Sequence, residues 1–228
     1  MPEAVRTVKV CKIFEGAVRS QVLFDIDLSF EQGTFNSIIG PSGSGKSTLM
    51  NIIGTLDRPT SGEVYLSGTR TESLDNKGLS KLRNKEIGFI FQFHYLLPEF
   101  TAIENVIMPQ RILQRKVDDK ARKRADELIE MVGLSKVKNN LSTKMSGGQQ
   151  QRTAIARALM NSPKVILADE PTGNLDSENS DQVYRLFREI NERLGTTFIV
   201  VTHDRRIAER TDRIVEMKDG RVLLDVHR

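Results

Sequence analysis

The segment "GPSGSGKS", residues 40–47, has the residue types and the spacing of a phosphate-binding loop. Gly43 and Gly45 allow the backbone to curve around an anion with its N–H groups turned inward, and Lys46 supplies a positive charge. The Ser47 hydroxyl is a suitable Mg²⁺ ligand. The pattern predicts that the phosphates of a nucleotide contact Gly40, Pro41, Ser42, Gly43, Ser44, Gly45, Lys46, Ser47 and Thr48.

The loop by itself does not name a reaction, because kinases, GTPases and motor ATPases all use it. A GTPase would need a guanine-reading element such as N-K-x-D, and the "DNKG" of residues 75–78 does not fit that pattern. A purely structural glycine turn is the alternative. The apolar strand expected before the loop and the helix expected after it favour phosphate binding, because a helix N-terminus adds a positive dipole.

Polar side chains stand at the ends of three further apolar runs. In "VILADE", Asp169 is suited to hold Mg²⁺ and Glu170 to orient or deprotonate an attacking water, although a pair of solvated acids is the alternative. Gln92 follows "IGFIF", from where its amide could reach the metal or its water. His203 ends "TTFIVVTH", where a ring N–H could stabilise charge on the terminal phosphate. A lone glutamine or histidine is more often a surface or structural residue.

A second glycine-containing segment, "MSGGQQQR" at residues 145–152, also has the features of an anion-binding helix start. Ser146 is a suitable N-cap, followed by Gly147 and Gly148. An ordinary capped helix is the alternative reading, and it is compatible with anion binding because the cap itself forms the surface. One chain of this size therefore carries two phosphate-facing loops.

The elements that must position these residues follow from hydrophobic periodicity. Residues 4–14 and 21–30 alternate apolar and polar side chains, which is typical of half-buried antiparallel strands. Short apolar runs separated by helical patterns indicate a parallel sheet covered on both faces, and the helical region is an insertion into it. We expect strands at residues 35–40, 62–68, 87–92, 164–169 and 196–203, and helices at 47–54, from near 148, and at 177–195.

Two helices have clear boundaries or faces in the sequence. The segment "DDKARKRADELIEMVGL" begins with Asp118 as a candidate N-cap and ends at Gly133 as a candidate C′ residue. In residues 177–195, five apolar side chains recur at helical spacing and should face the core. They are Val183, Leu186, Phe187, Ile190 and Leu194.

Composition narrows the class of protein. The net charge is +4, but no dense Lys/Arg tail accompanies it, so it is weak support for nucleic-acid binding. Cys11 is the only cysteine, which fits a reducing compartment and excludes an internal disulfide. We see neither the apolar region of a secretory signal nor a run near the roughly 20 residues that span a bilayer. We expect another chain to provide any membrane span.

Taken together, and in this order, these motifs resemble those of the nucleotide-binding subunit of an ABC transporter, and the resemblance covers nearly the whole chain. It implies an α/β fold: a P-loop (RecA-like) ABC ATPase core with an antiparallel β subdomain and an inserted α-helical subdomain. Residues 1–228 would form one nucleotide-binding domain. Its core would comprise residues 1–92 and 162–228, and its helical subdomain residues 93–161.

The resemblance also implies roles for individual residues, with ATP and Mg²⁺ as ligands. Catalysis would involve Glu170, His203 and Gln92, and the metal would be held by Ser47, Gln92 and Asp169. The signature residues Ser146, Gly147, Gly148 and Gln149, with Asp176 of the "GNLD" loop, would contact the nucleotide of a second chain. Phe14 stands near the family's adenine-stacking tyrosine, and a core phenylalanine is the alternative there. Met145 replaces the family's usual leucine.

The implied partners are a second subunit, in a head-to-tail dimer that is expected to be a homodimer, and integral membrane permease subunits docking near residues 93–109. The segment "QFHYLLPEFTAIENVIMP" resembles the lipoprotein-releasing branch of the LolD/MacB group, except that Tyr95 replaces a second histidine. This implies ATP-driven release or export of lipoproteins or other amphiphiles, by a peripheral protein on the cytoplasmic side of the inner membrane. Core packing of part of this apolar segment is the alternative to docking.

Other functions remain open within the same family. One is export of macrolides or peptides, as in the MacB type, and another is cell-division signalling without transport, as in the FtsE type. A DNA-associated ABC ATPase would need a long coiled-coil insertion, which these 228 residues do not contain. No nucleic-acid partner is therefore expected.

Overall fold

The computed structural model describes residues 2–16, 19–114, 117–204 and 208–228. Strands and helices alternate along most of the chain, as the periodicity predicts. In chain order the elements are β1 (Glu3–Phe14), β2 (Ser20–Glu31), β3 (Phe35–Ile39), α1 (Lys46–Ile53), β4 (Ser61–Leu66), β5 (Thr69–Arg70), α2 (Asn76–Glu86), β6 (Ile87–Phe91), α3 (Ala102–Leu113), α4 (Asp119–Met131), α5 (Gly147–Leu159), β7 (Val165–Asp169), α6 (Ser177–Leu194), β8 (Thr197–Val201), β9 (Arg213–Lys218) and β10 (Arg221–His227).

The larger sheet has the strand order β10-β9-β3-β8-β7-β6. All neighbouring strands from β9 to β6 are parallel, and only β10 pairs antiparallel at the edge. Strands β3 and β8 are buried at every position, because both faces of the sheet are covered. The predicted parallel sheet is confirmed, whereas the final hairpin of β9 and β10 was not anticipated.

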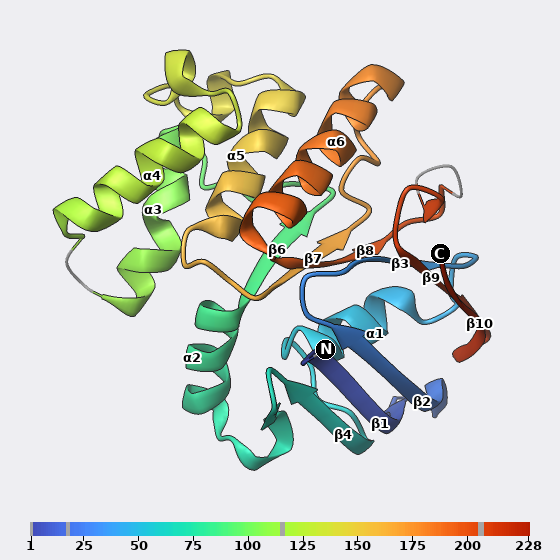
Figure 1. Cartoon of the computed structure of the whole chain (residues 1–228). Helices are drawn as coiled ribbons and strands as arrows, with labels where there is room; N and C mark the ends of the chain where they lie inside the picture. Colours follow the sequence, from blue (N-terminus) through green and yellow to red (C-terminus); the bar gives the residue numbers. More distant parts are fainter. Residues whose placement is uncertain (1, 17–18, 115–116, 205–207) are drawn as a thin grey trace.

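Two apolar cores lie on opposite faces of this sheet. Helices α3 to α6 cover one face, and α1 with the smaller sheet covers the other (Figure 1). Successive residues of a strand contribute to different cores, so that Ile166 belongs to the helical side and Leu167 to the other. The molecule is therefore built in layers, with the parallel sheet in the middle.

The smaller sheet has the order β2-β1-β4-β5 and is antiparallel, as the alternation of its residues predicts. It packs with α1 into one core, where Leu23 and Phe30 of β2 are fully buried. This packing brings β2 alongside the glycine-rich loop that precedes α1. Helix α2, by contrast, was not anticipated from the sequence. Its start is marked by Asp75, whose side chain accepts a hydrogen bond from the Gly78 N–H at 2.7 Å.

Helices α3, α4 and α5 lie between β6 and β7, so the predicted helical insertion is present. The predicted ends of α4 are also present. Asp118 accepts from the Ala121 N–H at 2.8 Å, and Gly133 is left-handed with φ of +72°. The expectation for Leu194 was wrong, because this side chain is 40% exposed. It occupies the last position of α6, before left-handed Gly195 turns the chain away from the packed helix face.

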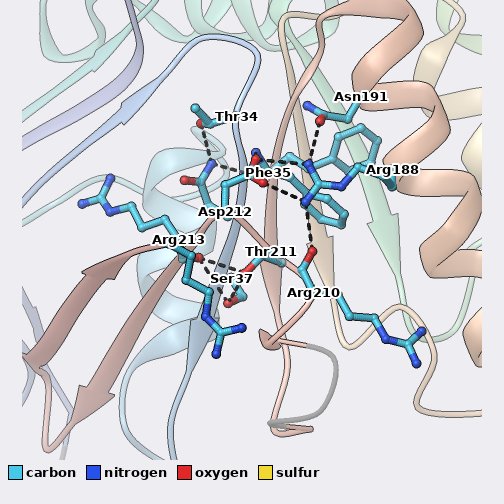
Figure 2. A network of polar contacts seen from close by, with 12 residues as sticks. Thr34, Phe35, Ser37, Arg188, Asn191, Arg210, Thr211, Asp212 and Arg213 are labelled. Atoms are coloured by element: carbon cyan, nitrogen blue, oxygen red, sulfur yellow. Dashed lines mark hydrogen bonds and ion pairs between the residues drawn. The ribbon is translucent and has the colours of Figure 1, made fainter.

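A polar network joins the C-terminal half of α6 to the start of β3 and β9 (Figure 2). The Arg188 guanidinium donates to both carboxylate oxygens of Asp212, at 2.8 and 3.2 Å, and to the Arg210 carbonyl oxygen at 2.9 Å. Asp212 in turn accepts from the Phe35 N–H at 2.9 Å. The network fixes the chain where it returns to the sheet after His203. Among the described residues, no helix is both long and apolar enough to cross a bilayer.

Candidate active site

The glycine-rich loop leaves the buried strand β3 and leads directly into α1. Two of its glycines are required by neighbouring atoms. At Gly40, φ is +151° and an added Cβ would lie 2.1 Å from the Met217 carbonyl oxygen. At Gly45, φ is +94° and a Cβ would lie 2.8 Å from Leu23 Cδ2. Any side chain at these positions would push the loop away from β9 and β2, so the tight turn depends on glycine.

Lys46 folds back across the loop and is only 8% exposed. Its Nζ donates to the Gly40 and Pro41 carbonyl oxygens, both at 2.8 Å. Burial lowers the pKa of Lys46, and the nearby charges of Glu170 and Asp169 oppose that shift. The ammonium group is therefore held inside the curve of the loop, where it can meet an anionic group.

Asp169 ends β7 and reaches the start of α1, where the Ser47 hydroxyl donates to Asp169 Oδ1 at 3.5 Å. Burial raises the pKa of Asp169, and the hydrogen bond from Ser47 opposes the shift. A hydroxyl and a carboxylate oxygen at this separation are hard donors that fit Mg²⁺. Among the described residues no group of three or more His, Cys, Asp or Glu could hold a metal.

Glu170 follows β7 with φ of +44°, which is uncommon for a residue that has a side chain. Its N–H donates to the Val201 carbonyl oxygen at 2.9 Å, which ties the residue to the end of β8. Its carboxylate Oε1 lies 2.9 Å from His203 Nδ1. A left-handed conformation persists where the surrounding structure dictates it, and such positions cluster at functional sites. Here it turns the carboxylate toward His203.

These side chains line one pocket of about 500 Å³ at the carboxyl ends of β3, β7 and β8. Residues 42–48, Asp169, Glu170 and His203 all contribute, whereas Gly40 and Pro41 shape the loop without lining the pocket. The sequence did not single out the two apolar members of the lining, Val22 and Val201, because a valine in a strand carries no chemical signal. The pocket offers N–H donors, an ammonium group, carboxylates and an imidazole, which suits binding and hydrolysis of a triphosphate.

Gln92 lies next to this pocket but not on its lining. Strand β6 pairs with β7 so that Phe91 is opposite Asp169, and Gln92 follows directly. The Gln92 amide donates to Asn174 Oδ1 at 3.0 Å, and Asn174 Nδ2 donates to the Gln92 carbonyl oxygen at 3.1 Å. Gly173 leaves room for this contact, since a Cβ there would lie 2.7 Å from Gln92 Nε2. The structure thus joins Gln92 to the "GNLD" loop.

The second glycine loop begins α5, outside the pocket around Lys46. Ser146 caps the helix: its hydroxyl accepts from the Gln149 N–H at 3.4 Å, and Gln149 Oε1 accepts from the Ser146 N–H at 3.1 Å. Gly148 lies against α6, where an added Cβ would be 3.3 Å from Asn179 Oδ1. None of the residues 146–149 lines the pocket around Lys46.

Asp176 and Phe14 also lie outside that pocket. Asp176 caps α6 by accepting from the Asn179 N–H at 2.8 Å, and hydrogen bonds from Asn179 lower the pKa of its carboxyl. Phe14 ends β1 and is 45% exposed, so it is not a core residue. The Lys12 ammonium lies 4.9 Å from the centre of its ring. Both residues are accessible to another molecule.

The sequence profile of the ABC transporter family matches residues 23–173, which include both glycine loops and the acidic end of β7. The lipoprotein-releasing system ATP-binding protein LolD 1 of Rhodopseudomonas palustris is 53% identical over 205 residues, or 90% of this chain and 91% of that protein. The LolD protein of Shewanella denitrificans is 51% identical over 212 residues, or 92% of this chain and 91% of that protein.

Solved structures show the same likeness. The dimeric ATP-binding cassette MJ0796, in a post-hydrolysis state bound to ADP and Pi, is 44% identical and superimposes with a TM-score of 0.89 over 98% of both chains. The cbiO1 protein of Clostridium perfringens, part of the ABC transporter complex cbiONQ, is 29% identical with a TM-score of 0.89, covering 100% of this chain and 89% of that one. The similarity therefore extends far beyond the glycine loop.

Proposed function

Because this chain belongs to the ABC transporter family and is an ABC-type ATPase, we propose that the pocket around Lys46 is where it binds and hydrolyses ATP. The observation that carries the proposal is the convergence of an ammonium group, a serine hydroxyl at the start of α1, two carboxylates and an imidazole on a single pocket. Those groups belong to Lys46, Ser47, Asp169, Glu170 and His203.

In the proposed binding step, the N–H groups of residues 43–48 and the N-terminus of α1 hold the phosphates, and Lys46 neutralises part of their charge. Ser47 and Asp169 would hold Mg²⁺, which when bound screens the phosphate oxygens and orients them for attack. Gln92 would reach the metal or its water after releasing Asn174. Phe14 would stack on the adenine ring.

In the proposed hydrolytic step, Glu170 accepts a proton from a water molecule as the water oxygen bonds to the terminal phosphorus. The bond from that phosphorus to the leaving oxygen breaks, which gives ADP and phosphate. His203, whose Nδ1 is 2.9 Å from Glu170 Oε1, keeps the carboxylate in position. A hydrogen on the other ring nitrogen, Nε2, when present, can also stabilise the charge that develops on the phosphate.

The second glycine loop is proposed to act on the nucleotide of another copy of the chain. The pocket of the same chain is not lined by Ser146, Gly147, Gly148, Gln149 or Asp176. Relatives of known structure include dimeric cassettes. In a head-to-tail homodimer, the N-terminus of α5 would face the partner's terminal phosphate with its positive dipole. Each ATP would then lie between two chains, and each chain would need both loops.

A membrane permease subunit is proposed to dock in an apolar groove of about 640 Å³ between α2, β6, α3 and α5. Among its lining residues are Phe89, Phe91, Tyr95, Leu97, Met108 and Ile112. Tyr95 and Ile112, which both line the groove, are each more than 60% exposed, which is unusual for large apolar side chains that share one groove. A short apolar helix of a membrane subunit would cover them, and the docking segment lies near residues 93–109.

The transported material is proposed to be lipoproteins or other amphiphiles, because relatives that are about half identical are ATP-binding proteins of lipoprotein-releasing systems. The chain would act as one nucleotide-binding domain at the cytoplasmic side of the inner membrane, with residues 1–92 and 162–228 as its core and 93–161 as its helical subdomain. Macrolide or peptide export and cell-division signalling are the alternatives.

Copurification followed by reconstitution separates these functions. We expect the tagged chain to be isolated with membrane subunits and, in proteoliposomes, to release an inserted lipoprotein to a soluble acceptor only with ATP and Mg²⁺. The Glu170→Gln variant should bind ATP and fail to release the lipoprotein. Export of a small molecule without lipoprotein release would contradict the proposal, as would ATP hydrolysis that moves no substrate at all.

A further inference from the structure

Two consecutive residues after β6 have left-handed backbone conformations without being glycine. His94 has φ of +59° and Tyr95 has φ of +47°. This conformation is unfavourable for residues with a Cβ, and two in succession are more so. The pair follows Gln92 by only two residues. Something in the surrounding structure must therefore hold this turn, and the turn fixes the direction in which the preceding chain leaves β6.

One guanidinium holds both residues. Arg157 NH2 donates to the His94 carbonyl oxygen, and Arg157 NH1 donates to the Tyr95 carbonyl oxygen, each at 2.6 Å. The planar fork of an arginine matches two neighbouring acceptors in a way that a lysine ammonium cannot. Arg157 is more than 60 residues from His94 and Tyr95 in sequence, so this contact joins the turn to α5.

Arg157 is half-buried, and its guanidinium donates to these two carbonyl oxygens. Burial lowers its pKa to about 10, and none of the ion pairs recorded among the described residues involves it. It sits near the end of α5, the helix that Ser146 caps, and Ser146 is about 16 Å away at the helical rise. Arg157 also lines the apolar groove, together with Tyr95. It therefore touches the groove, the turn and the helix that carries the second glycine loop.

We propose that Arg157 is a positioning residue for Gln92. By holding the strained turn at His94 and Tyr95, it fixes the segment that presents Gln92 at the edge of the nucleotide pocket and joins that segment to α5. The inference rests on the proposed role of Gln92 in hydrolysis. The contact of Arg157 with the His94 and Tyr95 carbonyl oxygens does not depend on the role of Gln92, and its effect on the turn can be measured separately.

The test uses the full chain and two readouts. Arg157→Met removes the fork and keeps an apolar side chain of similar length. We expect backbone hydrogen exchange in residues 91–97 to become about tenfold faster, because the turn loses the guanidinium that binds both of its carbonyl oxygens. We expect kcat for ATP hydrolysis to fall about tenfold while KM and the ATP dissociation constant change less than about twofold.

A second substitution that restores kcat in Arg157→Met would distinguish a positioning role of Arg157 from a general loss of structure. Asparagine tolerates the left-handed conformation, and Tyr95 is 64% exposed. In the isolated chain, where no membrane subunit occupies the groove that Tyr95 lines, Tyr95→Asn alone should change kcat little. In the double variant with Arg157→Met, Tyr95→Asn should restore kcat to within about threefold of the unaltered chain. Asparagine at this position adopts the left-handed backbone at little cost, so the turn depends less on the Arg157 guanidinium. If Arg157→Met does not fold, Arg157→Lys, which can satisfy only one carbonyl, provides the same comparison.

Arg152→Met is the matched control. Arg152 lies on the same helix and donates to the Val132 carbonyl oxygen at 3.2 Å and to Gln182 at 2.7 Å, away from the turn. It should leave exchange in residues 91–97 unchanged. Unchanged exchange in Arg157→Met would overturn the proposal, and so would a loss of kcat that Tyr95→Asn does not rescue. Faster exchange with normal kcat would instead contradict the role of Gln92.

Discussion

At the scale of single residues, the pocket depends on groups that the fold holds in uncommon states. Lys46 is buried with its ammonium on two carbonyl oxygens, and Glu170 has a left-handed backbone. Both arrangements cost free energy, which the surrounding strands offset because they fix the ends of the loops. Such side chains need little reorganisation when a charged substrate arrives, and this favours catalysis.

The first prediction concerns Lys46. Replacing Lys46 by alanine removes the positive charge inside the loop, so ATP affinity should fall about 10- to 100-fold and hydrolysis by at least about 100-fold. Isothermal titration with ATP and a phosphate-release assay would measure the two effects. Lys136→Ala removes an exposed lysine elsewhere and should change neither. Normal ATP turnover in Lys46→Ala would contradict the assignment of residues 40–48 as the phosphate-binding loop.

At the scale of elements, a helix and two strands are joined far from the nucleotide pocket by the network of Arg188 and Asp212 (Figure 2). Burial raises the pKa of Asp212, but hydrogen bonds from Arg188 and from the Phe35 N–H outweigh it, so the net pKa is below the ordinary 3.8. A carboxyl whose pKa is lower in the folded chain stabilises the fold when it is ionised. This contribution is complete above pH 3.8 and disappears as the pH falls through the folded value.

We therefore predict that Asp212→Asn lowers the free energy of unfolding by about 1–2 kcal/mol at pH 7, a value reduced from that of a buried ion pair because the group is partly exposed. The difference from the unaltered chain should shrink as the pH drops below the unfolded pKa of 3.8. Urea denaturation at several pH values measures it. Asp181→Asn breaks a more exposed pair with Arg210 at 2.8 Å and should cost less. A pH-independent loss in Asp212→Asn would refute the electrostatic explanation.

At the scale of the whole molecule, only one of the two glycine loops lines the pocket around Lys46, although both look like phosphate sites in sequence. The loop before α1 lines the pocket, and the loop before α5 faces outward beside the start of α6. The dimeric relatives indicate how two copies would combine them.

The corresponding prediction uses Ser146→Arg. The added side chain should block the approach of a partner without touching the pocket of its own chain. ATP binding by the single chain should stay within about twofold, while hydrolysis falls at least about 50-fold. In a Glu170→Gln background, gel filtration with ATP should show dimers, and adding Ser146→Arg should abolish them. The control Ser135→Arg, at another exposed serine, should leave the dimers intact. Loss of ATP binding in Ser146→Arg would mean that the serine serves its own chain.

Much of the site could be predicted from the sequence, because its signals are local. A glycine loop followed by Lys46 and Ser47, and acids at the end of an apolar strand, are read from neighbouring residues. Parallel strands place their carboxyl ends at one edge, so the meeting of Asp169 with the loop followed from the strand pattern. The antiparallel sheet, the caps of α4 and the helical insertion were predictable for the same reason.

Only the tertiary structure decided which distant side chains meet. Asn174 binds Gln92, and Arg157 holds His94 and Tyr95, across separations that no periodicity encodes. Leu194 belongs to the apolar stripe of α6 and is nevertheless exposed, since burial depends on what lies opposite. Local sequence determines the chemical groups and the element that carries each one, because backbone preference and capping act within a few residues. Hydrogen bonds and packing between elements depend on their relative placement, which only the folded chain establishes.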